Sequence, residues 1–245
     1  MERAEWLKQM REMTEALYDH ISPAYWVKFG LYENKAQQEY LQKFLGGIGR
    51  NGRVLSAACG AGRYDGMLLE AGHIVTGIDQ SAGMLARAKE HFPQAHYQKM
   101  GLQEMDFHEA FDGAICMDAL EHVCPEDWPG IMKRFREALK PGGLLYFTVE
   151  VPDEEEVKAS YEHAKAMGLP VLFGELANEV QASYDRVKAL DSQDAQGELA
   201  DVAVYHYYPS VEQVKEWIEQ AGLVIEEKGT GNGYDHYMVR REQET

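Results

Sequence analysis

A glycine-bearing loop is the first stretch of the chain whose residue types and spacing could bind a cofactor. It spans residues 57–63 (AACGAGR) and follows directly on the apolar stretch 53–57. Glycine lets the backbone approach a ligand closely, and free N–H groups at the start of a helix attract anionic groups. Asp79 lies 19 residues beyond Gly60, where a carboxylate can accept hydrogen bonds from both hydroxyls of a ribose. The loop and the acid together predict a site for a nucleoside-bearing cofactor.

A carboxylate-rich segment follows a later apolar stretch. Asp118, Glu121 and His122 come directly after residues 111–117. In sheets of parallel strands, ligands bind in the crevice beyond the carboxyl ends of the strands. His122 is a candidate general base because imidazole titrates near neutral pH, and Asp118 and Glu121 are candidate residues of a substrate pocket. The alternative is that Glu121 and His122 only hold their own loop in place.

The aromatic run 205–208 (YHYY) is a second candidate group. It precedes Ser210, which has the capping-box spacing of a helix start. We expect the run to lie at the same edge of the sheet, with Tyr205 and Tyr207 lining the substrate pocket and His206 as a second candidate base. A buried aromatic strand without contact to substrate is the alternative.

Alternating strand and helix patterns position these groups. Short apolar stretches predict strands, and apolar residues at helical spacing predict helices. The predicted elements are strand 53–57, helix 64–71, strand 73–79, a helix capped by Ser81, strands 95–100 and 111–117, helix 125–139 and strand 144–149. Such alternation implies a parallel sheet with helices on both faces and right-handed crossovers.

The two ends of the chain follow other patterns. An amphipathic helix is predicted from Trp6 to a break at Ser22-Pro23, followed by a second amphipathic stretch that ends at Gly46-Gly47. Strands 223–228 and 235–240 are joined by a link so short that only an antiparallel hairpin fits.

An acidic segment, 153–199, interrupts the alternation. Its pattern is mostly helical, with an interruption at Gly168. It is too long for an ordinary connection between a strand and a helix. We interpret it as a cap inserted over the carboxyl edge of the sheet.

Four stretches between residues 53 and 150 share their order and spacing with a known family. They are 54–62 (VLSAACGAG), 77–88 (GIDQSAGMLARA), 111–123 (FDGAICMDALEHV) and 139–145 (LKPGGLL). The loop reads Gly-x-Gly-x-x-x-Gly, with Gly60, Gly62 and Gly66, and not the dinucleotide pattern Gly-x-Gly-x-x-Gly. The chain thereby resembles class I S-adenosylmethionine-dependent methyltransferases, in the small-molecule branch that includes the ubiquinone/menaquinone-type enzymes.

The resemblance implies a fold and a division of the chain. The fold is α/β and Rossmann-like, with a seven-stranded, mostly parallel sheet in the order 3-2-1-4-5-7-6, an antiparallel last strand, N-terminal helices and a helical insert. The division is an N-terminal helical lid (1–50), an S-adenosylmethionine-binding core (51–152), a helical cap insert (153–204) and the C-terminal part of the core sheet (205–245).

The resemblance also implies which residues bind the cofactor. Asp79 would bind the ribose hydroxyls with Gln80 beside the adenine, and Gly60 and Gly62 would pack against the methionine and ribose. The implied cofactor-binding residues are Tyr18, Tyr25, Ala58, Cys59, Gly60, Gly62, Asp79, Gln80, Met84, Gly101, Leu102, Gln103 and Met117.

Two positions depart from the family pattern. Ser56-Ala57 stands where an acid usually opens the first motif. Gly101 stands where an Asp is often found near the adenine amino group. The backbone of Leu102 or the side chain of Gln103 is therefore expected to hold the adenine.

The implied function is transfer of a methyl group from S-adenosyl-L-methionine to N, O or C of a small-molecule acceptor by in-line displacement, with S-adenosyl-L-homocysteine as the product. The methyl donor is already activated, so a general base is needed only if the acceptor must lose a proton. No metal is expected. Two alternatives remain open: a protein that binds the cofactor without methylating, which the two departures favour, and a nicotinamide- or flavin-dependent oxidoreductase, which the terminal hairpin disfavours.

Composition and charge narrow the class of partner. The 245 residues include 24 Lys and Arg against 41 Asp and Glu, a net charge of −17 that repels nucleic acids and anionic membranes. The odd number of cysteines, three, without Cys-x-x-Cys spacing indicates neither a disulfide framework nor a structural zinc site. The sequence shows no secretory signal and no apolar run of membrane-spanning length, so we expect a cytoplasmic protein.

Overall fold

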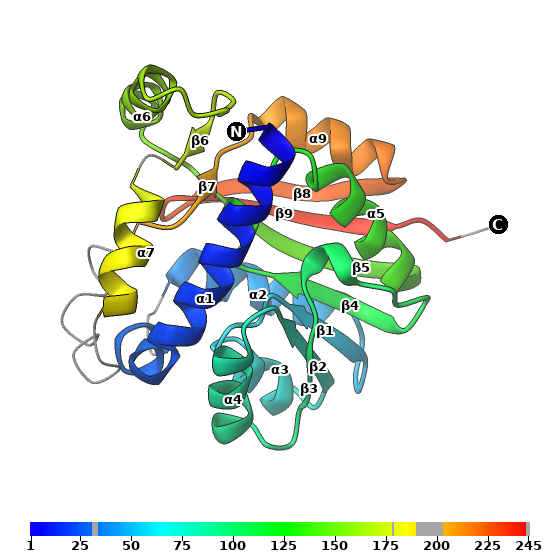
Figure 1. Cartoon of the computed structure of the whole chain (residues 1–245). Coiled ribbons are helices and arrows are strands. Elements are labelled where there is room, and N and C mark those ends of the chain that lie inside the picture. The colour runs from blue at the N-terminus through cyan, green and yellow to red at the C-terminus, as the bar shows by residue number, and fades with distance from the viewer. Residues whose placement is uncertain (31–33, 178, 190–202, 244–245) are drawn as a thin grey trace.

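A seven-stranded sheet forms the centre of the computed structural model, which describes residues 1–30, 34–177, 179–189 and 203–243 (Figure 1). The strand order is β3-β2-β1-β4-β5-β9-β8. The strands are β1 (Arg53–Ala57), β2 (Ile74–Asp79), β3 (His96–Lys99), β4 (Phe111–Cys116), β5 (Leu139–Glu150), β8 (Leu223–Gly231) and β9 (Tyr234–Arg241). The order 3-2-1-4-5-7-6 is confirmed, because β8 and β9 are the sixth and seventh strands of this sheet along the chain.

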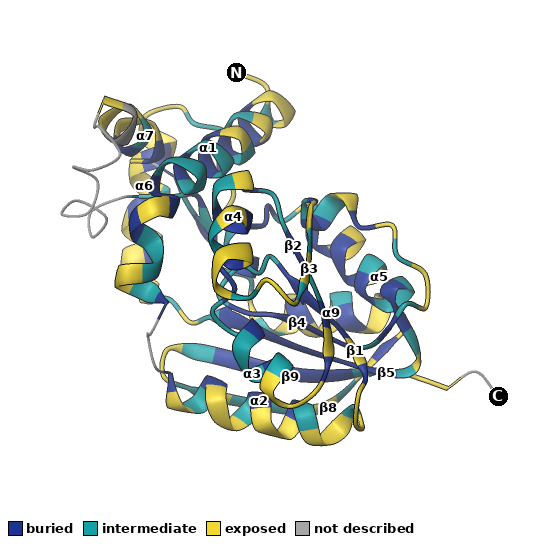
Figure 2. Ribbon diagram, turned by 90° about the horizontal axis from the view of Figure 1, so that it is seen from below, coloured by how far each residue is buried: buried dark blue, intermediate teal, exposed yellow. Residues whose placement is uncertain are grey.

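The strands from β3 to β5 are parallel. Strands β1, β2, β4 and β5 are covered on both faces, whereas the edge strand β3 is mostly exposed. Successive side chains of a strand point to opposite faces. Val54 packs in one apolar cluster with residues of α2 (Lys35–Gly47) and α3 (Asp65–Glu70). Leu55 packs in another with residues of α5 (Trp128–Ala138) and α9 (Val211–Gln220). Figure 2 shows the strands mostly buried and the outer sides of the helices exposed, which accounts for the nearly continuous apolar strand sequences.

Helix α1 (Arg3–Phe29) runs unbroken through Pro23, which corrects the predicted break at Ser22-Pro23. A proline inside a helix cannot donate to the carbonyl four residues earlier, here that of Asp19. The hydroxyl of Ser22 donates to this carbonyl instead, at 2.9 Å. The helix also packs against α4 (Ala82–His91) and α7 (Val180–Ala189), so tertiary contacts hold it together where the local sequence predicts an end.

Strand β5 begins earlier than predicted. It starts at Leu139 and not at Leu144, because Leu139 pairs with Phe111 of β4 before a shift in register. Gly142 and Gly143, which lie between the predicted helix and the predicted strand, are therefore part of an irregular strand start.

The terminal hairpin is antiparallel, as predicted, but its strands are longer. Gly231 pairs with Tyr234, so the turn consists of Asn232 and Gly233 alone. Both have positive φ, 51° and 83°, which is the backbone that a two-residue type I′ turn requires.

The predicted helical insert contains α6 (Glu154–Ala166) and α7, with the expected interruption at Gly168 between them. Residues 190–202 of that prediction lie outside the described residues. Figure 1 shows α7 beside α1, in agreement with the contacts between them. Two short strands, β6 (Glu175–Leu176) and β7 (His206–Tyr207), pair antiparallel. Strand β6 was not predicted, whereas β7 lies in the run 205–208, for which a strand was the alternative interpretation. Within the described part of the chain, no helix has the length and apolar character needed to cross a membrane.

Candidate functional site

Asp79 and the glycine loop are in direct contact at the carboxyl ends of β1 and β2. The carboxylate of Asp79 accepts the backbone N–H of Gly60 at Oδ2 and that of Ser81 at Oδ1, each at 2.8 Å. Gly60 has a φ of 54°, and a Cβ added there would meet no atom within 4 Å. Burial raises the pKa of Asp79 to about 6, although the two N–H groups act in the opposite direction. The loop backbone therefore lies bare beside a half-buried acid.

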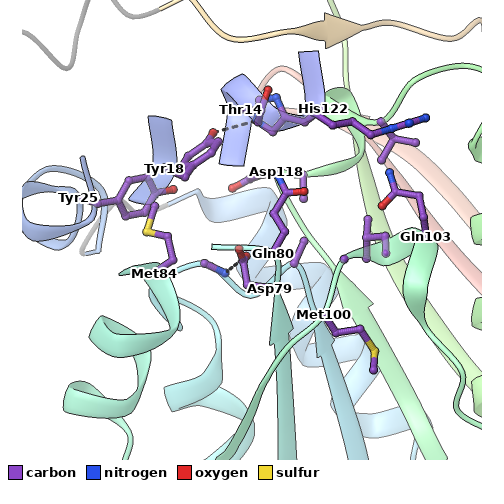
Figure 3. A pocket seen from close by; sticks show the side chains of 17 residues that line it. Thr14, Tyr18, Tyr25, Asp79, Gln80, Met84, Met100, Gln103, Asp118 and His122 are labelled. Atoms are coloured by element: carbon purple, nitrogen blue, oxygen red, sulfur yellow. Dashed lines mark hydrogen bonds between the residues drawn. The ribbon is translucent and has the colours of Figure 1, made fainter. Parts of the chain in front are cut away.

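A cavity opens beside this pair, and most of the predicted cofactor-binding residues line it (Figure 3). They come from α1, from the start of α4 and from the segments that follow β1, β2 and β3. The predicted residues that line this cavity are Tyr18, Tyr25, Ala58, Gly60, Asp79, Gln80, Met84, Gly101, Leu102 and Gln103. Segments far apart in the sequence thus meet at one place, beyond the carboxyl ends of the parallel strands.

Three predicted residues lie elsewhere around the loop. Cys59 and Met117 line an adjoining hollow together with Arg63. Gly62 lines neither space: with a φ of 83°, it packs where an added Cβ would lie 3.1 Å from the ring of Phe92. Gly62 therefore allows the loop to approach the neighbouring helix rather than a ligand.

Sequence reasoning missed several lining residues, namely Arg11, Thr14, Met100, Ala119 and Val123. Arg11, Thr14, Tyr18 and Tyr25 recur at intervals of three, four and seven residues, so one face of α1 covers the cavity. This spacing could have identified the residues of α1 that line the cavity, but a helix that packs against a core has the same spacing. Arg11 and Gln103 both donate to Asp127, at 3.1 and 3.3 Å, and so close one end of the cavity.

His122 is held in one tautomer by its neighbours. Its Nδ1 lies 3.0 Å from the carbonyl oxygen of Tyr205, which can only accept, so Nδ1 carries the hydrogen. Its Nε2 therefore accepts the hydroxyl hydrogen of Tyr18, at 2.9 Å. Burial lowers the pKa of His122 and raises that of Tyr18. A neutral imidazole thus faces the cavity through a tyrosine hydroxyl, as the dashed line in Figure 3 shows.

Asp118 has a φ of 52° and forms the centre of a polar network. It pairs with the guanidinium of Arg63 and accepts hydrogen bonds from Tyr64, at 2.8 Å, and from Gln37. Its own N–H donates to the hydroxyl of Thr148 at 3.0 Å. The network fixes a carboxylate and a guanidinium side by side at the adjoining hollow.

A second cavity adjoins the first and shares Tyr18, Tyr25, Asp118 and His122 with it. Its other lining residues are Leu17, Ile21, Phe29, Arg63, Glu121, Glu150, Val204, His206 and Tyr234. The ring centroids of His122 and His206 lie 4.8 Å apart. Burial and the neighbouring His122 lower the pKa of His206 to about 3. The two predicted bases and Glu121 are therefore brought together.

Tyr205 and Tyr207 line neither of these two cavities, which corrects the expectation that they face a substrate. The hydroxyl of Tyr205 donates to Glu175, and its ring packs edge-on against Trp6, with centroids 5.9 Å apart. The hydroxyl of Tyr207 accepts from Gln213 at 3.1 Å. Residues of β7 alternate in direction, so His206 faces the cavity while the tyrosines on either side face the core.

A buried acid contacts Ser56, which stands where the family pattern usually has an acid. Asp65, at the start of α3, is fully buried and accepts the hydroxyl of Tyr97 at 2.8 Å. Burial raises its pKa to about 6. Its Oδ2 would lie 3.2 Å from a Cβ at Gly62, so this carboxyl lies directly beneath the glycine loop.

The residues that the structure describes contain no group of three or more His, Cys, Asp or Glu arranged to hold a metal ion.

Comparisons with known proteins agree with this geometry. Residues 54–143 match a family described as a methyltransferase domain. The chain is 28% identical over 146 residues to a ubiquinone biosynthesis O-methyltransferase of Haemophilus ducreyi, an alignment that covers 54% of this chain and 61% of that protein. The chain thus spans less than two thirds of the length of the curated relative.

Two solved structures share the fold. A methyltransferase of Methanosarcina mazei has a TM-score of 0.64 at 19% identity and covers 87% of this chain and 100% of its own. The second is the 1,6-didemethyltoxoflavin-N1-methyltransferase of Burkholderia thailandensis, bound to 1,6-didemethyltoxoflavin and S-adenosylhomocysteine. It has a TM-score of 0.62 at 17% identity, and the alignment covers 95% of this chain and 90% of that protein. The domain match over residues 54–143 and the strand order agree with the resemblance to class I S-adenosylmethionine-dependent methyltransferases.

Proposed function

We propose that the protein transfers a methyl group from S-adenosylmethionine to N, O or C of a small-molecule acceptor. The observation that carries the proposal is the contact between Asp79 and Gly60 at the mouth of a cavity that α1 covers. Both oxygens of Asp79 already accept one backbone N–H each, and each retains a lone pair. This arrangement is suited to a ribose whose two hydroxyls donate to one carboxylate.

The residues around Asp79 fit the remaining parts of the cofactor. Gln80 and Leu102 lie on the side where the adenine would bind, and Gly60 leaves open space for the methionine chain. Arg63 and Asp118, side by side, offer a cation and an anion to the carboxylate and the ammonium of the methionine end. S-adenosylmethionine supplies a methyl group that its positively charged sulfur has already activated.

The contribution of the chain to the reaction is then positioning and exclusion of water. Effective concentration and orientation can lower a barrier by roughly 7–11 kcal/mol in favourable cases. Helix α1 contributes to positioning and to exclusion of water by covering the cavity with Thr14, Tyr18 and Tyr25.

If the acceptor is an uncharged group, such as a hydroxyl, that must lose a proton, the Tyr18–His122 pair is the route we propose. The hydroxyl oxygen of Tyr18 can take a proton while its own hydrogen passes to Nε2 of His122. His206, whose pKa is about 3, is too weak a base for this role near neutral pH.

The proposal includes the class of partner and the compartment. The relatives named above act on small molecules by their names, and the net charge of −17 argues against a nucleic acid. The described cysteines Cys59, Cys116 and Cys124 are free thiols, which is typical of a reducing compartment and supports the proposal of a cytoplasmic protein.

Calorimetric titration with S-adenosylmethionine and S-adenosylhomocysteine tests the proposal. The unaltered protein should bind both, and Asp79→Ala should bind about ten- to a hundredfold more weakly, because it lacks hydrogen bonds to a charged acceptor. Asp153→Ala, which removes a helix cap of α6 outside the cavity, is the control. Absence of binding to the unaltered protein would overturn the proposal, and binding without turnover on any acceptor would favour a non-methylating binder.

A further inference from the structure

The second cavity is the place where an acceptor would meet the cofactor. It has a volume of about 340 Å³ and shares Tyr18 and His122 with the cavity beside Asp79. Cavities of this size accommodate small organic ligands. The chemical character of its walls therefore bears on the class of acceptor.

Carboxylates outnumber cationic groups in these walls. Asp118, Glu121 and Glu150 line the cavity, and Arg63 is its one Lys or Arg among the described residues. Arg63 is paired with Asp118. In the part of the chain that the structure describes, Glu121 and Glu150 take part in no ion pair, and Glu150 accepts only a long hydrogen bond of 3.3 Å from Tyr208. Two acids thus face the cavity without a cation.

Glu121 provides an independent observation. Only 5% of the residue is exposed, and its Oε2 has no hydrogen-bond partner among the described residues. A buried carboxylate oxygen without a donor is costly, so its partner is expected to come from the ligand. Burial and the nearby charges of Asp118 and Glu150 hold the pKa of Glu121 well above its ordinary value, and a bound cation would relieve this.

Aromatic rings form the rest of the walls. The ring centroids of Tyr18 and Tyr25 lie 6.2 Å apart, and those of Tyr25 and Phe29 lie 5.0 Å apart. Tyr234 of β9 lines the cavity as well. The faces of aromatic rings attract cations, and their edges accommodate the carbon skeleton of a small ligand.

We propose that this cavity binds a primary or secondary amine as the methyl acceptor, with its ammonium group between Glu121 and Glu150 and its apolar part against the tyrosine rings. The inference rests on the proposed function and adds the class of substrate to it. An acidic acceptor would meet three carboxylates here, and a neutral hydroxyl would leave the acids without a cation.

The protons and electrons of the reaction balance for an amine. An ammonium has no lone pair, so one of the carboxylates first takes a proton from it and becomes neutral. The lone pair of the amine then forms the nitrogen–carbon bond to the methyl group, while the sulfur–carbon bond breaks and leaves its electron pair on sulfur. The product leaves as a methylated ammonium ion, and the carboxyl group returns its proton to solvent.

A matched set of three compounds tests the inference. The compounds are 2-phenylethylamine, 2-phenylethanol and phenylacetate, which share one carbon skeleton and differ in the charge of the head group. Binding of each to the protein saturated with S-adenosylhomocysteine is measured by calorimetry, and methylation of each is measured as S-adenosylhomocysteine formed from S-adenosylmethionine. We expect the amine to bind at least about tenfold more tightly than the alcohol, and the acid not to bind.

Two isosteric variants locate the effect. Glu121→Gln and Glu150→Gln keep the shape of the side chain and remove its charge, so each should weaken binding of the amine at least about tenfold and leave the affinity for S-adenosylhomocysteine unchanged. Glu219→Gln, at an exposed position of α9, is the matched control. Two variants are used because one of them alone could disturb the fold.

The outcomes separate this inference from the proposed function. Preferential binding of the alcohol or the acid, or binding of the amine to both variants as tightly as to the unaltered protein, would overturn the amine assignment while methyl transfer stands. Binding of S-adenosylhomocysteine without binding of the amine would do the same. Failure of the protein to bind S-adenosylhomocysteine would instead overturn the proposed function, on which this inference rests.

Discussion

Asp19 of α1 accepts a hydrogen bond from the hydroxyl of Ser81 at 2.6 Å, and Ser81 donates its backbone N–H to Asp79 at 2.8 Å. The same oxygen of Asp19 accepts the N–H of Gly83 at 2.8 Å, in the first turn of α4. The helix that covers the cavity is thus bonded to the turn that holds the acid of the cofactor site. Closure by α1 and the position of Asp79 are therefore linked by one carboxylate.

This link predicts that Asp19 supports cofactor binding without lining the cavity. Asp19→Ala removes acceptors at the start of a helix, a loss of about 0.5–2 kcal/mol, which corresponds to roughly two- to thirtyfold weaker binding of S-adenosylhomocysteine. Calorimetry measures the affinity. Asp153→Ala removes a comparable cap from α6 and should leave the affinity unchanged. Equal affinities of the two variants would show that Asp19 stabilises α4 and nothing more.

Binding of S-adenosylhomocysteine is expected to depend on pH through Asp79. Its pKa of about 6 means that the carboxylate is protonated below this pH, and a protonated carboxyl loses an acceptor for the ribose hydroxyls. The affinity should therefore be constant above about pH 7 and fall as the pH decreases through 6, approaching tenfold per unit. Titrations between pH 5 and 8 measure the slope.

Two variants identify the titrating group. Asp79→Asn should bind weakly at every pH and show no slope in this range. Asp65 has a similar pKa but contacts Tyr97 and does not line the cavity, so Asp65→Asn should keep the slope. A slope that persists in Asp79→Asn and disappears in Asp65→Asn would assign the titration to Asp65, and the role proposed for Asp79 would be wrong.

The close approach of α1 to α4 requires a glycine. A Cβ added to Gly83 would lie 2.5 Å from the hydroxyl oxygen of Ser22 and 2.9 Å from the carbonyl oxygen of Asp19. Gly83→Ala should therefore lower the free energy of unfolding by about 1–3 kcal/mol and weaken binding of S-adenosylhomocysteine. Urea denaturation measures the first effect and calorimetry the second.

Gly130 provides the control for Gly83. It lies in the first turn of α5, and a Cβ there would meet no atom within 4 Å. Gly130→Ala should raise the free energy of unfolding by up to about 1 kcal/mol, because alanine loses less backbone entropy in a helix. If both alanine variants were equally stable, the contact between the two helices would be looser than the structure indicates.

Much of the fold could be predicted because its signals are local. The apolar runs of β1, β2 and β4 and the spacing between Gly60 and Asp79 each lie within one strand–helix–strand unit, where sequence distance fixes the distance in space. The terminal hairpin was equally evident, since a link as short as 229–233 leaves no room for a crossover.

The parts that could not be predicted depend on contacts between distant segments. Pro23 predicts a helix end, and only the hydroxyl of Ser22 and the packing of α1 on α4 and α7 override it. Tyr205 and Tyr207 were expected to face a ligand, but a short strand alternates, and whether a tyrosine or His206 faces the cavity depends on pairing with β6. The hydrogen bond between Tyr18 and His122 joins residues 104 positions apart, so no local sequence pattern predicts it.

That bond leads to the last prediction, which concerns the titration of His122. The hydroxyl of Tyr18 donates to Nε2 of the neutral ring and so favours the neutral form, in addition to burial, which already lowers the pKa. Tyr18→Phe should therefore raise the pKa of His122, as measured by NMR titration of the imidazole. Tyr25→Phe is the control, because Tyr25 lines the same cavities and makes ring contacts with Tyr18 but is in no hydrogen bond with His122 among those described. An unchanged titration in Tyr18→Phe would mean that the tyrosine does not stabilise the neutral imidazole, and the proton route through this pair would have to be abandoned.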